Sequence, residues 1–281
     1  MFPAKFDYHR AESLDHALSL LGENAGAKVL AGGHSLLPMM KLRLAQPQTL
    51  VDVSRVAELR GITETGSGLR IGALTTHAEL ASSGAVRTRC SLLAEAAGKI
   101  GDPQVRNFGT VGGNIAHADP ASDLPAVFVA LGATIHLKSA QGERQVAAED
   151  FFVDLLMTDL QAGEILTAVT VPALGEGTGS AYLKVEHPAS GYALCGAAAI
   201  VNQNNGAASL AFNGVTPTPF HAQAVTDALN GDLSDASIDR AVSEHLEIDD
   251  PLSDLQASEE YRVELARTYG KRALKAARDR A

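Results

Sequence analysis

The chain has 281 residues, a length that predicts about two domains. Its 33 acidic and 23 basic residues give a net charge of −10, which excludes nucleic acid or an acidic membrane face as the main partner, since both require a basic surface. The apolar fraction of 46% is enough for a buried core and excludes a disordered chain.

The first fifty residues predict a compact α/β unit. Ser13 is placed to cap a helix whose apolar residues recur at Leu14, Ala17, Leu18 and Leu21, and Gly22 is expected to end it. The expected elements are a strand at 7–8, a helix at 14–21, a strand at 28–31, a helix at 36–44 and a strand at 49–53.

A second segment begins near Glu58 and ends in an apolar strand at 165–171. A long glycine-rich stretch, 101–120, interrupts it. The other expected elements are strands at 69–73, 133–138 and 144–147 and helices at 76–81, 91–99 and 125–131.

The loop at 172–179 is the best candidate boundary, because proline and glycine cluster there between two β-like runs. Strands at 180–185, 193–202 and 207–212 predict a meander, with a hairpin turn at 204–206. A helix is expected at 259–277. Its acids come early and its bases late, which suits the helix dipole, although a basic docking surface for a partner is an alternative.

The two cysteines, Cys90 and Cys195, are isolated, so they hold neither an iron–sulfur cluster nor a structural zinc, which need about four ligands. The charged N-terminus lacks the apolar run of a signal peptide, and no stretch approaches the ~18 apolar residues of a membrane span. These features predict a soluble, cytoplasmic protein.

Two glycine motifs share one chemistry. The sequence AGGHS at 31–35 leaves a strand toward a helix, and TVGGN at 110–114 follows a loop. Paired glycines let backbone N–H groups approach an anion, and a helix N-terminus adds free donors and a favourable dipole. Ser35 and Asn114 add side-chain donors. Two such sites would suit a diphosphate, whereas the plain alternative is a pair of tight turns.

Competing motifs are absent or weak. A Rossmann fingerprint beginning at Gly66 would need glycine where Ile71 stands, and no P-loop GK[ST] occurs. The histidines lack metal-ligand spacing, so no metal site is expected, and no nucleophile elbow supports hydrolysis. Asp119 and Asp123 precede a helix, where they could cap it or bind a ribose or ring of a ligand.

The residues AGGHSLLPMMKLRLAQP at 31–47 and QVRNFGTVGGNIAHADPASDLPA at 104–126 resemble the two FAD-binding signatures of molybdenum-hydroxylase flavoproteins, the medium subunits of carbon monoxide dehydrogenase and related aldehyde, xanthine and N-heterocycle dehydrogenases. The resemblance extends over essentially the whole chain, including FDYHR near the start and KVEHPASGYA at 184–193.

This resemblance implies an α+β protein with an FAD-binding fold of the vanillyl-alcohol-oxidase type and a small C-terminal α/β domain. The implied boundaries are 1–56 and 57–175 for the two FAD-binding subdomains and 178–281 for the C-terminal domain. The implied FAD-binding residues are Ala31, Gly32, Gly33, His34, Ser35, Leu36, Thr110, Val111, Gly112, Gly113, Asn114, Asp123, Leu166, Lys184 and Tyr192. Tyr192 matches an aromatic residue that lies beside the isoalloxazine ring, and no catalytic residue is implied.

The resemblance also implies partners: a small subunit with two [2Fe-2S] clusters and a large molybdopterin subunit, assembled as a dimer of heterotrimers. Electrons would reach FAD from the clusters and leave to an acceptor such as NAD⁺ or a quinone. The run VEHPASGY at 185–192 departs from the basic KRKIGDY-like run expected of carbon monoxide oxidisers, so the substrate stays open. The alternatives are a stand-alone FAD oxidoreductase of the same superfold and a non-catalytic nucleotide-binding or assembly protein.

Overall fold

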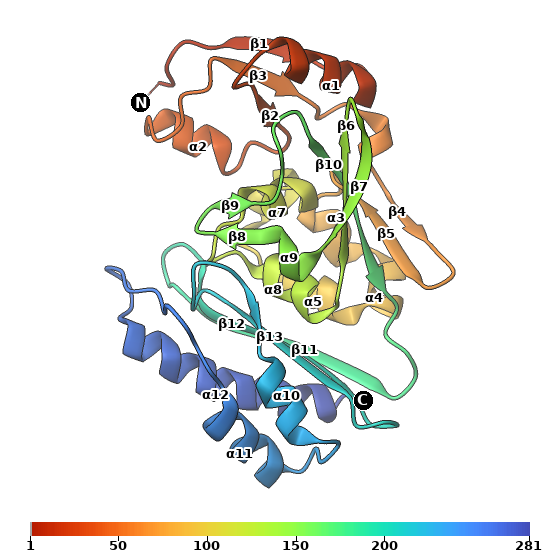
Figure 1. Ribbon diagram of the computed structural model, residues 1–281, viewed down its shortest axis with the longest axis vertical. Coiled ribbons are helices and arrows are strands. Elements are labelled where there is room, and N and C mark those ends of the chain that lie inside the picture. Colours follow the sequence, from red (N-terminus) through yellow and green to blue (C-terminus); the bar gives the residue numbers. More distant parts are fainter. Residues whose placement is uncertain (1) are drawn as a thin grey trace.

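The computed structural model describes residues 2–281. Its elements form three stacked layers around three main sheets (Figure 1). The N-terminal sheet is parallel, in the order β1-β3-β2, and α1 packs against β3. Its elements are β1 (Asp7–Arg10), α1 (Leu14–Glu23), β2 (Lys28–Leu30), α2 (Leu36–Lys41) and β3 (Thr49–Asp52).

All five predicted elements of this unit are present. The Ser13 hydroxyl accepts a hydrogen bond from the His16 N–H, as expected of a helix cap. Helix α2 ends three residues before the predicted Leu44, because Leu42 leaves the helix and Arg43 takes a left-handed φ of 63°.

The middle sheet is antiparallel, in the order β4-β5-β10-β6-β7. Its strands are β4 (Ile62–Glu64), β5 (Gly68–Gly72), β6 (Thr134–Ser139), β7 (Gly142–Ala147) and β10 (Ile165–Pro172). The helices of this segment are η1 (Ala57–Leu59, a 3-10 helix), α3 (His77–Ser82), α4 (Gly84–Arg89), α5 (Ser91–Gly98), α6 (Pro103–Phe108), α7 (Val111–His117), α8 (Asp123–Ala130) and α9 (Ala148–Phe151). A short hairpin, β8 (Phe152–Asp154) and β9 (Met157–Thr158), stands apart from the sheet.

The glycine-rich stretch, which was not predicted as helical, contains two helices. Asp102 caps α6 by accepting the Val105 N–H, and Pro103 occupies its first position. Thr110 caps α7 by accepting the Gly113 N–H at 3.1 Å. Both helices begin at local capping signals, and neither is long enough to show helical periodicity.

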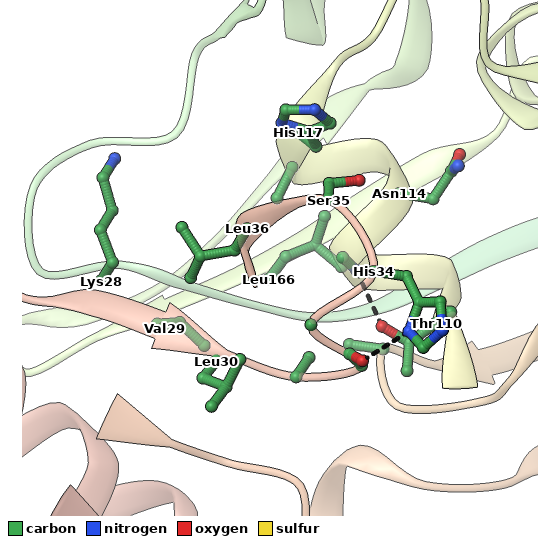
Figure 2. Close-up of a pocket in the computed structure, with 18 of the residues that line it drawn as sticks. Lys28, Val29, Leu30, His34, Ser35, Leu36, Thr110, Asn114, His117 and Leu166 are labelled. Carbon is green, nitrogen blue, oxygen red and sulfur yellow. Dashed lines mark hydrogen bonds between the residues drawn. The ribbon is translucent and has the colours of Figure 1, made fainter. Parts of the chain in front are cut away.

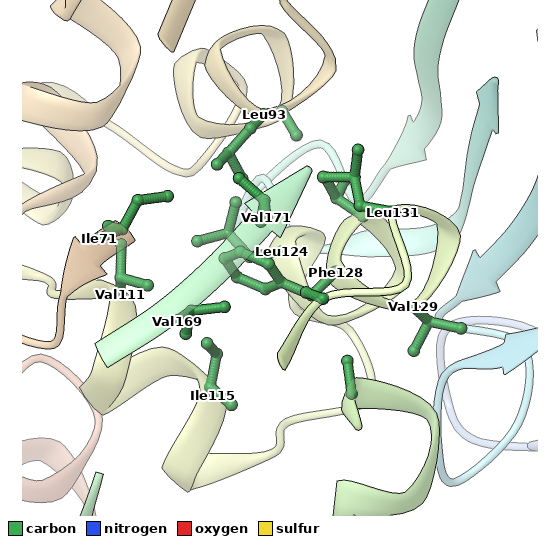
Figure 3. Close-up of a cluster of buried hydrophobic side chains, with 14 of the residues drawn as sticks. Ile71, Leu93, Val111, Ile115, Leu124, Phe128, Val129, Leu131, Val169 and Val171 are labelled. Atoms are coloured by element: carbon green, nitrogen blue, oxygen red, sulfur yellow. The ribbon is translucent and has the colours of Figure 1, made fainter. Parts of the chain in front are cut away.

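The largest buried cluster joins the middle sheet to its helices. Figure 3 shows Ile71 of β5 and Val169 of β10 together with side chains of α5, α7 and α8. Phe128, wholly buried in α8, lies within this cluster. The core therefore holds α7, which carries the second glycine motif, firmly against the sheet.

The C-terminal segment is the predicted meander with helices on its outer side (Figure 1). The antiparallel order is β11-β12-β13-β14, and the turn at 204–206 joins β12 to β13. Its elements are β11 (Thr178–Glu186), β12 (Ala193–Asn202), β13 (Ala208–Asn213), β14 (Phe220–His221), α10 (Gln223–Leu229), α11 (Asp235–His245) and α12 (Glu259–Arg278).

Two bases at the end of the last helix are paired inside the molecule. Lys275 bonds Asp239 at 2.8 Å and Arg278 bonds Asp235 at 2.6 Å, and both acids belong to α11. These ion pairs attach α12 to α11. Among the described residues, no helix has the length and apolar character needed to cross a membrane.

Candidate functional site

Both glycine motifs line one cavity of about 700 Å³ between the N-terminal and middle layers. This volume lies in the range that encloses small molecules and cofactors. Figure 2 shows Leu30 of β2, His34 and Ser35 of the following loop, Asn114 of α7 and Leu166 of β10 around this space. The expectation that the two motifs face the same space is therefore confirmed.

The first motif presents a row of free backbone donors. Gly33 has a φ of 73°, which turns the chain sharply between β2 and α2. The four consecutive N–H groups of residues 33–36 donate no hydrogen bond within residues 2–281. Ser35 also makes no side-chain capping bond, so its hydroxyl is free. Consecutive free N–H groups at such a turn can bind an anion.

The second motif differs from expectation, because its backbone donors are already used. The N–H groups of Val111 and Gly112 donate to the carbonyls of Thr75 and Ala73 at the end of the middle sheet. The Gly113 N–H donates to the capping hydroxyl of Thr110, and the Asn114 N–H bonds back within the first turn. The donors that this motif offers are therefore side chains rather than the helix N-terminus.

Thr110 and Asn114 supply those polar side chains. The Thr110 hydroxyl accepts the Gly113 N–H and keeps its own hydrogen to donate. The Asn114 amide donates to Ser122 Oγ at 2.6 Å, while its carbonyl oxygen is buried without a partner in the described chain. A buried oxygen without a partner is costly, so a hydroxyl or N–H of a bound ligand would complete it.

The glycines of the two motifs allow close packing within the protein, in addition to giving an anion access to the backbone. A Cβ on Gly32 would lie 2.0 Å from the Phe108 carbonyl oxygen, and one on Gly113 would lie 3.9 Å from Ala31 Cβ. The His34 ring also stacks on Phe108, with centroids 5.3 Å apart. A Cβ on Gly112 would meet Ala73 at 2.6 Å. Gly32 therefore lets segments 31–36 and 108–114 touch, and Gly112 lets α7 lie against Ala73.

Asp123 lines the cavity from α8, but it does not cap that helix. Its buried carboxylate accepts the Tyr182 hydroxyl at 2.6 Å and lies 3.2 Å from the Lys184 ammonium. Burial raises the pKa of Asp123 to about 6, although the Lys184 charge and the Tyr182 hydrogen bond act to lower it. The capping interpretation is wrong for Asp123, because its partners come from the distant strand β11. Asp119 instead accepts the nearby Ala121 N–H.

The predicted site residues divide into a large group at the cavity and a small group behind it. Those that line it are Ala31, Gly32, Gly33, His34, Ser35, Leu36, Thr110, Gly112, Gly113, Asn114, Asp123, Leu166 and Tyr192. Val111 points into the core, and Lys184 lies beneath the wall with a side chain only 4% exposed. Neither of these two lines the cavity.

Two further parts of the wall were missed in the sequence. The loop at 160–165 lines the cavity and is held by Arg144, which bonds Glu164 at 2.7 Å and Asp159 at 2.5 Å. His77 also lines it, and its Nδ1 is buried without a partner in the described chain. Burial lowers the pKa of His77 to about 4, so the ring is neutral at physiological pH. No local motif marks either feature.

The arrangement fits a dinucleotide with a diphosphate. Free N–H groups at 33–36 and the hydroxyl of Ser35 face Thr110 and Asn114 across a cavity of suitable size. The described residues contain no group of three His, Cys, Asp or Glu side chains that could hold a metal ion. The donors themselves are uncharged backbone N–H, hydroxyl and amide groups, which is how a chain with a net charge of −10 can bind an anion.

Comparisons with known proteins agree with this geometry. Residues 4–174 match the family described as "FAD binding domain in molybdopterin dehydrogenase", and residues 180–277 match "CO dehydrogenase flavoprotein C-terminal domain". The carbon monoxide dehydrogenase medium chain of Hydrogenophaga pseudoflava is 42% identical, with 99% of this chain and 98% of the relative covered. The glyceraldehyde dehydrogenase medium chain of Sulfolobus acidocaldarius is 40% identical, with 98% and 99% covered.

Solved structures give the same result. A chain of reconstituted carbon monoxide dehydrogenase from Oligotropha carboxidovorans superposes with a TM-score of 0.96 at 38% identity, with 100% of both chains covered. The fold expected from the sequence, an FAD-binding part followed by a small C-terminal domain, is therefore confirmed.

Proposed function

The chain belongs to the family of FAD-binding medium chains of molybdopterin dehydrogenases, and from this membership we propose that it carries electrons within a molybdenum hydroxylase complex. The observation that carries the proposal is the cavity in which free N–H groups at 33–36 face Thr110 and Asn114. These donors would bind the diphosphate of FAD.

The chain's residues bind and orient the cofactor and perform no acid–base step. FAD, when bound, supplies redox chemistry that connects one-electron and two-electron carriers. The N–H groups at 33–36, Ser35, Thr110 and the remaining amide hydrogen of Asn114 would hold the diphosphate, and Asn114 Oδ1 would accept a hydroxyl or N–H of the cofactor. Tyr192 is the one Phe, Tyr or Trp side chain that lines the cavity among the described residues, and its half-exposed ring would pack against the flat isoalloxazine ring.

The electron path is part of the same proposal. A large molybdopterin subunit would oxidise the substrate, and a small subunit with [2Fe-2S] clusters would deliver the electrons to this chain. This chain would pass them to an external acceptor such as NAD⁺ or a quinone. The two partners and this chain would assemble as a dimer of heterotrimers. The subdomain boundaries at 1–56, 57–175 and 178–281 and the cytoplasmic location stay predictions.

The substrate is a property of the large subunit in this proposal. Relatives named for carbon monoxide and for glyceraldehyde are 42% and 40% identical to this chain, so overall similarity does not separate the two. Medium chains of this kind would therefore work in complexes that oxidise different substrates.

Binding of FAD, ADP and FMN to the purified chain tests the proposal. FAD and ADP both contain the diphosphate, whereas FMN has the ring system and a single phosphate. We expect the chain to bind FAD and ADP and to bind FMN far more weakly. Equal affinity for FMN and FAD would contradict the diphosphate site, and turnover of a substrate by the chain without partners would favour the stand-alone oxidoreductase.

A further inference from the structure

A buried lysine joins three segments of the cavity wall from beneath. Lys184 of β11 donates from Nζ to the Asp123 carboxylate at 3.2 Å, to the Gly191 carbonyl at 2.8 Å and to the Lys99 carbonyl at 2.7 Å. An ammonium group has three hydrogens, so each acceptor receives one. The lysine is fully satisfied without any ligand.

Each of the three acceptors belongs to a different part of the wall. Asp123 lines the cavity itself, and the Lys99 carbonyl immediately precedes the lining residues 100–101. Gly191 lines the cavity next to Tyr192. A Cβ on Gly191 would lie 3.6 Å from Gly101 Cα, so the last two parts are in contact. Lys184 therefore holds together one end of the cavity.

The turn that carries Tyr192 has few other attachments. Within residues 187–192, the His187 N–H donates to the Tyr192 carbonyl, the Gly191 N–H donates to the His187 carbonyl, and the Tyr192 N–H donates to Ser190 Oγ. These bonds close the turn on itself. Among the residues that the structure describes, the bond from Lys184 is the one hydrogen bond between residues 187–192 and the rest of the chain. Directly after the turn, the Ala193 N–H donates to the Ala121 carbonyl and Ala193 pairs with Glu186 of β11.

We propose that Lys184 is a positioning residue that fixes Tyr192 against the isoalloxazine ring of FAD without touching the cofactor. The inference rests on the proposed FAD function. It differs from the expectation that Lys184 contacts FAD, because its side chain lies outside the cavity. The diphosphate donors at 33–36 make no contact with this lysine, so its loss should affect the ring end of the cofactor and spare the diphosphate end.

The test compares FAD with ADP on the full chain carrying Lys184→Met. We expect the Kd for FAD to rise about tenfold, which corresponds to one aromatic stacking contact. The Kd for ADP should stay within about twofold, because ADP has the diphosphate and lacks the ring. The fluorescence and visible spectrum of bound FAD should change to those of Tyr192→Ala, a change that a general loss of stability would not produce.

Lys275→Met is the control. This lysine is also paired inside the molecule, with Asp239 at 2.8 Å, but the pair joins α12 to α11 and does not line the cavity. We expect wild-type FAD spectra from it. Tyr192→Ala added to Lys184→Met should cause no further change in FAD affinity, because the tyrosine is already displaced.

Lys184→Met leaves the buried Asp123 carboxylate without its cationic partner, so a second variant is needed. The double variant Lys184→Met/Asp123→Asn removes both charges, and it should bind ADP and show the altered FAD spectrum. Unchanged FAD spectra, additive effects with Tyr192→Ala, or loss of ADP binding in both variants would overturn the proposal. A wild-type chain that binds no FAD would instead overturn the proposed function.

Discussion

Replacing Gly32 with alanine is expected to separate the two glycine motifs and weaken FAD binding. The added Cβ would lie 2.0 Å from the Phe108 carbonyl oxygen and 2.8 Å from its carbonyl carbon, whereas real Cβ contacts essentially never fall below 3.0 Å. The obstacle is backbone and cannot rotate away, so one segment must move by about 1 Å.

The size of the effect follows from the cost of overpacking. Extra atoms in a well-packed site typically cost about 1–3 kcal/mol, which corresponds to an increase in the Kd for FAD of about 5- to 150-fold if the strain falls on the donors. Titration of the FAD-free chain measures this change, and thermal unfolding without FAD shows whether the fold survives. Gly98→Ala is the control, because its Cβ would meet nothing within 4 Å. A Gly32→Ala chain that binds FAD as tightly as Gly98→Ala would refute the reasoning.

Three other changes should have distinct effects. Asn114→Ala should raise the Kd for FAD about 2- to 12-fold through the loss of one hydrogen bond. Asn114→Asp should raise the Kd further, most of all at low salt, because its negative charge would repel the diphosphate. Equal Kd values for the two variants in an FAD titration would contradict a diphosphate next to residue 114. His77 has a folded pKa of about 4, below its unfolded value, so stability should be lost as pH falls from about 6.5 to 4. In denaturant titrations, His77→Gln should reduce the acid-induced fall in the free energy of unfolding by up to about 3 kcal/mol, because glutamine does not titrate. A variant whose free energy of unfolding falls with pH as in the wild type would argue against a neutral buried ring. The buried guanidinium of Arg262 donates to the carbonyls of Leu194 and Gly214. Arg262→Met removes this donor and should lower the free energy of unfolding by about 2–4 kcal/mol. A loss below about 0.5 kcal/mol in a denaturant titration would show that these bonds matter little.

Local patterns in the sequence predicted most of the regular elements. The apolar spacing after Ser13 predicted helix α1, although the helix runs through Gly22 to Glu23, so the expectation that Gly22 ends it was wrong. The run from 193 to 202 matches strand β12. Helices α6 and α7 were missed because they are too short for a periodic pattern. Their capping residues, Asp102 and Thr110, were the available signals.

The sequence was sufficient to find the glycine motifs, but it did not show which of their backbone N–H groups have hydrogen-bond partners within the protein. The N–H groups of Val111 and Gly112 are used because the end of β5 and the residues after it lie against α7, a tertiary contact that no local pattern contains. The sequence likewise left Asp123 open between a helix cap and a ligand contact, and only the packing of β11 brings Tyr182 and Lys184 to its carboxylate. Side-chain roles that depend on distant strands require the fold.

Backbone amide NMR of the chain, recorded with and without ADP, tests the central claim most directly. If the diphosphate accepts hydrogen bonds from the free N–H groups at 33–36, these four amide signals should move strongly downfield. The amides of Gly112 and Gly113 should move little, because they already donate within the protein. Saturating ADP that leaves the signals of residues 33–36 in place would contradict the account.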